Sequence, residues 1–325
     1  QKAFELSEKY STPVLLRPTT RVDHAYQSLG MPELSQSRSK GEFEKNPNRW
    51  VIFPRLSFAN HKKIFERNEK VLPKEFSQEE YKSFNNIEKI DLSFVEEKSS
   101  ADRKSISFAA GGISYAYLKE ALTIIKNENP QNIQIQSAKI LKIGTPYPFP
   151  EPLAKEFLNE TEQVIVFEEL DPVIEEKLIF ICGKNQLKTK IHGKLDETVP
   201  CAGELSVEII KNIILQKTGI PNLQENQKEK IDLPVRPPVL CAGCPHRGAF
   251  YAVKQAMKGK KTVYCGDIGC YTLGNASPLD MTDTCLCMGA DITMAQGFYH
   301  NEPDRFCFSF IGDSTFFASG ITGVV

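Results

Sequence analysis

The segment Arg305-Phe-Cys-Phe-Ser-Phe-Ile311 runs directly into Gly312-Asp-Ser-Thr315. Its apolar run predicts a buried strand, and the turn with small residues after it predicts a strand-to-helix transition suited to a diphosphate group. Backbone N–H groups at such a turn face phosphate oxygens, and Asp313 is placed to hold a divalent cation that bridges them. On these four residues alone, a tight turn with a capping Asp is an equally good interpretation.

Residues 105–218 alternate between strand and helix patterns. Strands are predicted at 105–109, 137–143 and 162–167, with helices at 113–127 and 150–159. This alternation is typical of a parallel α/β sheet. The acidic segment Glu168-Glu-Leu-Asp171 follows the third strand, where it either caps the next helix or performs acid–base chemistry.

A further block, residues 239–325, follows a Pro-rich linker at residues 219–238. Cysteines and glycines gather there in three motifs that each follow an apolar run. They are Cys241-Ala-Gly-Cys244-Pro-His-Arg247, Cys265-Gly-Asp-Ile-Gly-Cys270 and Asp283-Thr-Cys-Leu-Cys-Met-Gly289. Loops after successive parallel strands meet at one edge of the sheet, so these motifs and the Gly312 turn are expected to surround one cofactor.

Composition narrows the class of protein. The 325 residues carry 40 basic and 41 acidic side chains, a net charge of −1 that gives no general attraction to nucleic acid or an anionic membrane. The chain has no apolar segment of the roughly 18 residues that a membrane span needs, and Gln1 begins no secretory signal. All nine cysteines lie at or after Cys182, which favours reduced thiols. We therefore expect a cytoplasmic protein.

The cysteine spacing leaves three interpretations open. Cys241-x2-Cys244 with Cys265-x4-Cys270 approaches a zinc ribbon, although the second pair is widely spaced. Cys241, Cys244 and Cys270 would suit a four-iron cluster with a fourth thiolate from elsewhere. The third interpretation is that these are buried small residues in a cofactor loop. His246 either shuttles protons or contacts a carboxylate together with Arg247, or it is a packed, hydrogen-bonded side chain.

Taken together, the motifs resemble the alpha subunit of the indolepyruvate:ferredoxin oxidoreductases, a thiamine-diphosphate-dependent family. The resemblance covers Leu240–Arg247, Cys265–Gly274, Leu286–Ala290 and Phe310–Phe317. It extends nearly end to end, because further segments match in the same order. They are Thr12–Arg17, Thr19–Val22, Arg49–Val51, Gly112–Tyr115, Gly144–Pro148, Glu168–Pro172, Ile191–Leu195 and Ala202–Leu205.

The resemblance implies oxidative decarboxylation of an aryl pyruvate with coenzyme A, giving an arylacetyl-CoA, carbon dioxide and reduced ferredoxin. It implies thiamine diphosphate and Mg²⁺, a beta subunit as partner, and a possible [4Fe-4S] cluster on Cys241, Cys244 and Cys270. By position, Asp313 would bind magnesium and Gly312 and Ser314 would contact the diphosphate. The cofactor pocket would be lined by Gly269, Cys270, Met288 and Gly289.

The same resemblance predicts the domain organisation. Residues 1–30 would end a pyrimidine-binding domain, 31–104 would form a connector, and 105–218 a transketolase C-terminal-like domain. After the linker at 219–238, residues 239–325 would begin the thiamine-diphosphate-binding domain.

Four departures from the family pattern accompany this prediction. Only 12 residues follow Asp313, too few to include the Asn ligand expected roughly 25 residues on. The acidic residue that activates the cofactor is expected outside the chain, which leaves the catalytic residue unknown, and the family's ferredoxin-like cysteine repeats are absent. Ala318 stands where the family usually has His. A non-oxidative thiamine-diphosphate decarboxylase or lyase, or a catalytically silent scaffold subunit, are the alternatives.

Overall fold

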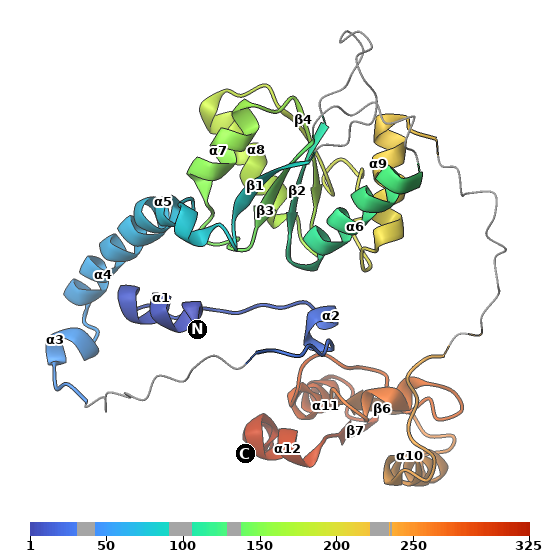
Figure 1. The fold of residues 1–325 in the computed structure, drawn as a ribbon. Coiled ribbons are helices and arrows are strands. Elements are labelled where there is room, and N and C mark those ends of the chain that lie inside the picture. The colour runs from blue at the N-terminus through green and yellow to red at the C-terminus, as the bar shows by residue number, and fades with distance from the viewer. Residues whose placement is uncertain (31–42, 91–105, 129–137, 222–233, 235) are drawn as a thin grey trace. The chain divides into compact units, whose positions relative to one another are not determined.

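The structure is a computed structural model that describes residues 1–30, 43–90, 106–128, 138–221, 234 and 236–325 (Figure 1). The chain divides into two compact units, Gln1–Lys228 and Glu229–Val325. The division lies within the linker predicted at residues 219–238. Most of that linker, and much of the connector predicted at residues 31–104, lie outside the described residues.

The first unit contains a five-stranded sheet whose strand order is β1-β3-β2-β4-β5. All neighbours pair in parallel except the edge strand β1, which is antiparallel to β3. The strands are β1 (Asn86–Ile90), β2 (Ile106–Gly111), β3 (Ala138–Ile143), β4 (Gln163–Phe167) and β5 (Lys190–His192). The sequence predictions for β2, β3 and β4 are confirmed, although the predicted first residues 105 and 137 lie outside the described residues. The sequence does not predict β1, which lies within the segment interpreted as a connector.

Two pairs of helices cover the two faces of this sheet (Figure 1). One face packs against α6 (Gly112–Glu128) and α9 (Val207–Thr218), and the other against α7 (Glu151–Asn159) and α8 (Val173–Asn185). Adjacent strand residues therefore enter different cores: Phe108 joins the α6–α9 core and Ala109 joins the α7–α8 core. Burial on both faces explains why the strands are almost continuously apolar. The predicted α/β class is confirmed.

Buried carboxylates hold the loops at the C-terminal edge of β4 and β5. Glu168 accepts the backbone N–H groups of Ile174 at 2.8 Å and Glu175 at 3.0 Å, so it caps the first turn of α8. Glu175 is itself buried and accepts the N–H groups of Lys194 at 2.7 Å and Leu195 at 3.2 Å. Burial raises the pKa of both carboxyl groups. The capping interpretation therefore accounts for Glu168, the buried member of the acidic segment.

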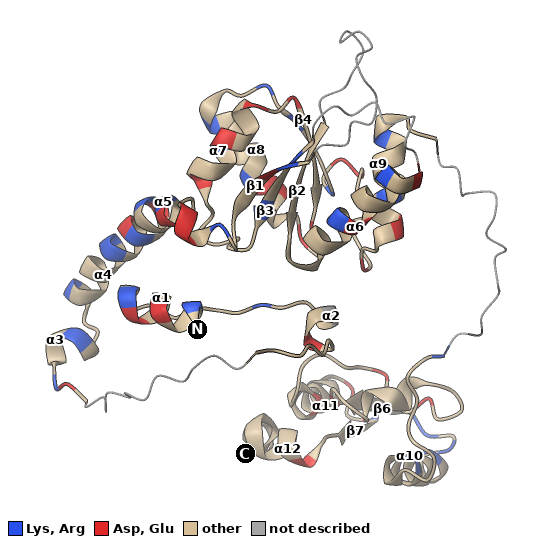
Figure 2. Cartoon of the chain, viewed as in Figure 1, with Lys and Arg blue, Asp and Glu red and all other residues tan. Residues whose placement is uncertain are grey.

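Short helices precede the sheet. They are α1 (Lys2–Tyr10), α2 (Thr20–Asp23), α3 (Pro47–Trp50) and α4 (Pro54–Glu66), which continues through a π-helical turn (Arg67–Val71) into α5 (Leu72–Glu75). A 3₁₀ turn (Glu79–Tyr81) follows. Most helices of this unit carry both acidic and basic side chains (Figure 2). α1 packs against Leu72, Phe76 and Tyr81, and Tyr81 donates a hydrogen bond to Glu75 at 2.7 Å.

The second unit is built on two parallel strands, β6 (Thr262–Gly266) and β7 (Phe306–Phe310). α10 (Pro245–Ala256) precedes β6, and α11 (Ala290–Asn301) connects the strands and packs against both. After β7 come α12 (Asp313–Thr315), a π-helical turn (Phe316–Gly320) and α13 (Ile321–Val324). The strand predicted at residues 305–311 is confirmed, but within β7 only Phe310 is buried.

Aromatic rings form the core of the second unit. Phe250 is completely buried and meets the ring of Phe310 at 4.8 Å and that of Tyr271 at 5.7 Å. Gly274 lies so close to Phe250 that a Cβ built on this glycine would come within 2.3 Å of the ring. This packing fixes the loop after β6 against α10. In the parts of the chain that the structure describes, no helix is long and apolar enough to cross a membrane.

Candidate functional site

The predicted cofactor loops meet at one edge of the second unit. Because β6 and β7 are parallel, the residues that follow them, Asp267 and Ile311, leave the sheet on the same side. A third loop joins them through a parallel bridge between Cys265 and Thr284, supported by a 2.8 Å hydrogen bond from the Gly266 N–H to the Thr284 carbonyl. The loops after β6, before α11 and after β7 are thereby gathered as the sequence predicts.

Asp267 is the residue that links these loops. Its side chain is 2% exposed, with one carboxylate oxygen accepting the N–H of Gly289 at 3.3 Å and the other accepting the N–H of Gly312 at 3.2 Å. The backbone N–H of Asp267 donates to the carbonyl of Phe310, the last residue of β7, at 3.0 Å. Asp267 is not among the site residues predicted from the sequence. Its place directly after a buried strand, within a Gly-Asp-x-Gly motif, is the signal that could have identified it.

Gly269 and Cys270, two predicted pocket residues, lie in the loop that begins at Asp267. The hydroxyl of Thr272 donates to the Asp267 carbonyl at 2.9 Å and accepts the Gly269 N–H at 3.3 Å. The φ angle of Gly269 is 134°, a conformation that requires glycine. The side chain of Cys270 is exposed. These contacts fix a tight loop from which the Cys270 thiol reaches solvent.

Met288 and Gly289 lie at the start of α11. Gly289 is the N-cap residue, with φ 87° and ψ −3° in the left-handed region. The Ser319 hydroxyl donates to the Met288 carbonyl at 3.2 Å, which ties this loop to the helical segment after β7. A Cβ on Gly289 would lie 2.6 Å from that hydroxyl oxygen. The two segments therefore pack backbone against side chain at close range.

Gly312, Asp313 and Ser314 begin the helical segment after β7. The side chains of Asp313 and Ser314 are exposed, and within the described residues no ion pair or hydrogen bond engages the Asp313 carboxylate. The first N–H groups of a helix lack intrahelical partners. This corner therefore offers an open carboxylate beside unpaired backbone donors, the combination that a magnesium-bound diphosphate requires.

Apolar side chains from the same loops remain exposed around this polar corner. Ile268 follows Asp267, Leu286 and Met288 precede Gly289, and Phe317 follows the α12 turn. The exposed fraction of these four side chains is between 45% and 75%. Apolar side chains around a few polar groups are typical of a cofactor site.

The cysteine motif that leads into α10 lies beside the same loops. The Cys244 Sγ is 3.1 Å from His246 Nδ1, and the His246 ring packs edge-on against Tyr271 with centroids 4.6 Å apart. Cys241 and Cys270 are exposed, so the interpretation as buried small residues is wrong for these two cysteines, whereas Cys265 is buried as it expects. Among the described residues, no three His, Cys, Asp or Glu side chains are grouped as metal ligands. The iron–sulfur assignment stays a prediction.

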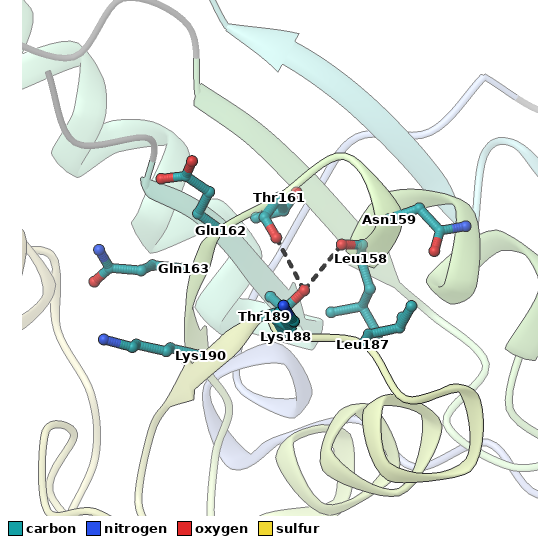
Figure 3. Close-up of a pocket in the computed structure, with 9 residues that line it drawn as sticks. All are labelled: Leu158, Asn159, Thr161, Glu162, Gln163, Leu187, Lys188, Thr189 and Lys190. Carbon is teal, nitrogen blue, oxygen red and sulfur yellow. Dashed lines mark hydrogen bonds between the residues drawn. The ribbon is translucent and has the colours of Figure 1, made fainter. Parts of the chain in front are cut away.

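A cleft elsewhere in the molecule has different surroundings. It has a volume of about 350 Å³ and lies in the first unit where β4 and β5 begin, between residues 158–163 and 187–190 (Figure 3). The Thr189 hydroxyl holds its walls together through hydrogen bonds to the carbonyls of Leu158 at 3.0 Å and Thr161 at 2.9 Å (Figure 3). Open α/β sheets bind ligands at the carboxyl ends of their strands, and this cleft is at the amino ends.

Comparison with known proteins identifies the class to which the chain is similar, the indolepyruvate oxidoreductases. The particular relatives are subunits named "Indolepyruvate oxidoreductase subunit IorA". That of Methanothermobacter thermautotrophicus is 36% identical over 328 residues, covering 99% of this chain and 49% of the relative. That of Thermococcus kodakarensis is 36% identical over 344 residues, covering 98% and 49%. The resemblance predicted from the motifs is thus confirmed, and the chain spans about half the length of these relatives.

No family model matches the chain. A solved 2-oxoglutarate:ferredoxin oxidoreductase from Magnetococcus marinus has a TM-score of 0.32 at 17% identity, covering 51% of this chain and 24% of that chain. A likeness at this level supports no functional inference.

Proposed function

We propose that the chain is part of a thiamine-diphosphate-dependent 2-oxoacid:ferredoxin oxidoreductase that acts on indolepyruvate or related aryl pyruvates. The reaction converts the 2-oxoacid and coenzyme A into an arylacetyl-CoA and carbon dioxide, and it reduces ferredoxin. The observation that supports this most strongly is the similarity to indolepyruvate oxidoreductase subunits over 99% of the chain. The convergent loops of the second unit supply the corresponding site.

The residues at these loops suit thiamine diphosphate with Mg²⁺. Asp313 would be a magnesium ligand, because its carboxylate is exposed and has no ion pair within the described residues. Gly312 and Ser314 would lie against the diphosphate at the start of α12. A hard divalent cation prefers such oxygen ligands and can bridge them to phosphate oxygens.

The pocket residues would hold the organic part of the cofactor. Gly269, Cys270, Met288 and Gly289 line the adjacent loops, and the exposed apolar side chains there would shield the reacting region from water. When bound, the cofactor supplies the decarboxylation of the 2-oxoacid and retains the electrons left behind. The chain's own residues bind and orient it and keep the loops in place.

The proposal includes partners and a route for the electrons. A beta subunit would complete the enzyme, ferredoxin would accept the electrons, and coenzyme A and the 2-oxoacid would be the substrates. Cys241, Cys244 and Cys270 are the proposed ligands of a [4Fe-4S] cluster with a thiolate from elsewhere, and their loops would have to draw together to bind it, because the described residues do not group them as metal ligands. Cys241 and Cys270 are accessible, and His246 brings its motif against Tyr271, the neighbour of Cys270. Because the reaction needs coenzyme A and oxidised ferredoxin, the cytoplasm is the proposed location.

The test is an assay of the intact complex, with a viologen dye or ferredoxin as electron acceptor. We expect reduction that depends on indolepyruvate and coenzyme A together and is slower with pyruvate at equal concentration. Carbon dioxide release from indolepyruvate without acceptor reduction would instead identify a non-oxidative decarboxylase. Absence of both products from a complex that binds its partner subunit would identify a silent scaffold, the alternative suggested by Ala318.

A further inference from the structure

We infer that Asp267 is a positioning residue that holds the loops carrying Gly289 and Gly312 in the arrangement that receives the cofactor's diphosphate. The inference rests on the proposed function for the identity of the ligand. The arrangement of the loops themselves rests on hydrogen bonds within the second unit. Asp267 is not proposed to touch the cofactor.

Both oxygens of the carboxylate are committed to backbone donors. Gly289 N–H lies 3.3 Å from one oxygen and Gly312 N–H lies 3.2 Å from the other, on loops 23 residues apart in sequence. Hydrogen bonds from N–H groups to an ionised carboxylate are stronger than those to neutral acceptors. One buried charge thus fixes the relative position of two predicted cofactor-binding loops.

The carboxylate is in turn held by its own backbone. The Asp267 N–H donates to the Phe310 carbonyl at 3.0 Å, and its carbonyl accepts the Thr272 hydroxyl at 2.9 Å. The side chain is 2% exposed, so water does not compete for its oxygens. Because β6, β7 and the Gly269 loop all hold Asp267 in place, its carboxylate is a fixed point to which the loops of Gly289 and Gly312 bind.

The hydrogen bond from Gly312 also determines which donors remain for a phosphate. Its N–H points to Asp267, so the N–H groups available at this turn are those that follow, beginning with Asp313. Asp267 therefore acts indirectly, by setting the direction in which the start of α12 presents its donors. Such outer partners typically change ligand affinity by about 10–100-fold when they are removed.

Other buried acids in this unit have different partners, which provides a matched control. Asp291 is 1% exposed and accepts a hydrogen bond from the Ser309 hydroxyl. Asp267→Asn and Asp291→Asn are therefore the same isosteric change at two buried carboxylates. Only Asp267→Asn replaces a carboxylate oxygen that accepts a loop N–H. In its place stands an amide NH₂ group, which is itself a donor and cannot accept that N–H.

The experiment measures backbone hydrogen exchange in the full-length protein without cofactor, in peptides covering residues 286–291 and 310–316. It also measures the Kd for thiamine diphosphate with Mg²⁺ by calorimetry. We expect Asp267→Asn to speed exchange of the Gly289 or Gly312 amide and to weaken cofactor binding by about 10–100-fold. Asp291→Asn should leave both amides protected and the Kd within about twofold of wild type.

Wild-type protein provides a second measurement for the case in which Asp267→Asn does not fold. Because the Gly289 and Gly312 N–H groups donate to the buried Asp267 carboxylate, both amides should exchange about as slowly as the amides of β6 and β7. Unchanged exchange and Kd in Asp267→Asn, or equal changes in Asp291→Asn, would overturn the inference. So would exchange of both amides in wild type as fast as that of exposed amides without a hydrogen bond. If the wild-type protein binds no cofactor while Asp267→Asn still loosens the loops, the proposed function fails and the loop-linking role stands.

Discussion

Replacing Gly289 by Ala perturbs the site at a close approach between the loop before α11 and the side chain of Ser319. Gly289 has φ 87°, and the new Cβ would lie 2.6 Å from the Ser319 hydroxyl oxygen and 3.3 Å from the backbone nitrogen of Gly320. A non-glycine residue in the left-handed region costs roughly 1–2 kcal/mol. The hydroxyl can rotate away, but it then gives up its hydrogen bond to Met288.

The expected cost is the sum of these two effects. Loss of the Ser319 hydrogen bond adds about 0.5–1.5 kcal/mol to the backbone cost, so Gly289→Ala should destabilise the second unit by about 1.5–3.5 kcal/mol. In a Ser319→Ala background the hydroxyl is already absent. The same glycine substitution should then cost only the roughly 1–2 kcal/mol of backbone strain.

A double-mutant cycle measures this difference. Denaturant-dependent hydrogen exchange of the β6 and β7 amides gives the opening free energy of the second unit separately from that of the first. We expect a coupling energy of about 1 kcal/mol between positions 289 and 319. Equal costs of Gly289→Ala in the two backgrounds would show that the contact with Ser319 does not exist.

Three further predictions concern other parts of the chain. Gly274→Ala should destabilise the second unit by at least about 1–3 kcal/mol, measured by hydrogen exchange of the β6 and β7 amides, because the new Cβ would lie 2.3 Å from the Phe250 ring. Adding Phe250→Leu should partly restore the stability, since it removes the ring that the Cβ meets. Burial raises the pKa of Asp196, but the hydrogen bonds that its carboxylate accepts, led by the one from His192, together outweigh burial and hold that pKa well below its usual range. Wild type should therefore be more stable than Asp196→Asn in urea titrations above about pH 4, and this difference should shrink as the pH falls further. A constant difference down to pH 2 would contradict this. Ser206→Ala removes the N-cap of α9 and should cost about 1 kcal/mol in the same titrations; no change would mean that water replaces the cap.

The sequence predicts the strands whose side chains are buried on both faces. β2 and β4 are nearly continuous apolar runs, and such runs bounded by turn residues indicate buried strands. β1 is Asn-Ile-Glu-Lys-Ile, in which Ile87 and Ile90 pack into opposite cores, so it shows neither a continuous nor an alternating apolar pattern. Its pairing at the edge of the sheet depends on tertiary contacts that no local pattern shows.

The site is predictable in part for similar reasons. Motif order and the parallel arrangement of strands indicate that the loops at Gly269, Gly289 and Gly312 meet at one edge. The role of Asp267 depends on which distant N–H groups its carboxylate accepts, and no sequence pattern predicts that pairing. The exposure of Cys241 and Cys270 is likewise a property of the folded loops.

The most direct test of the central claim is a calorimetric titration of thiamine diphosphate into the full-length protein, with Mg²⁺ and with a chelator. Wild-type protein should bind the cofactor only with Mg²⁺, and Asp313→Asn should weaken that binding by more than about 100-fold, beyond the effect typical of an outer partner. Asp304→Asn is the matched control, because it changes an exposed Asp just before β7, at the opposite end of the strand. Wild-type affinity in Asp313→Asn, or equal losses in the two variants, would contradict the placement of the cofactor at these loops.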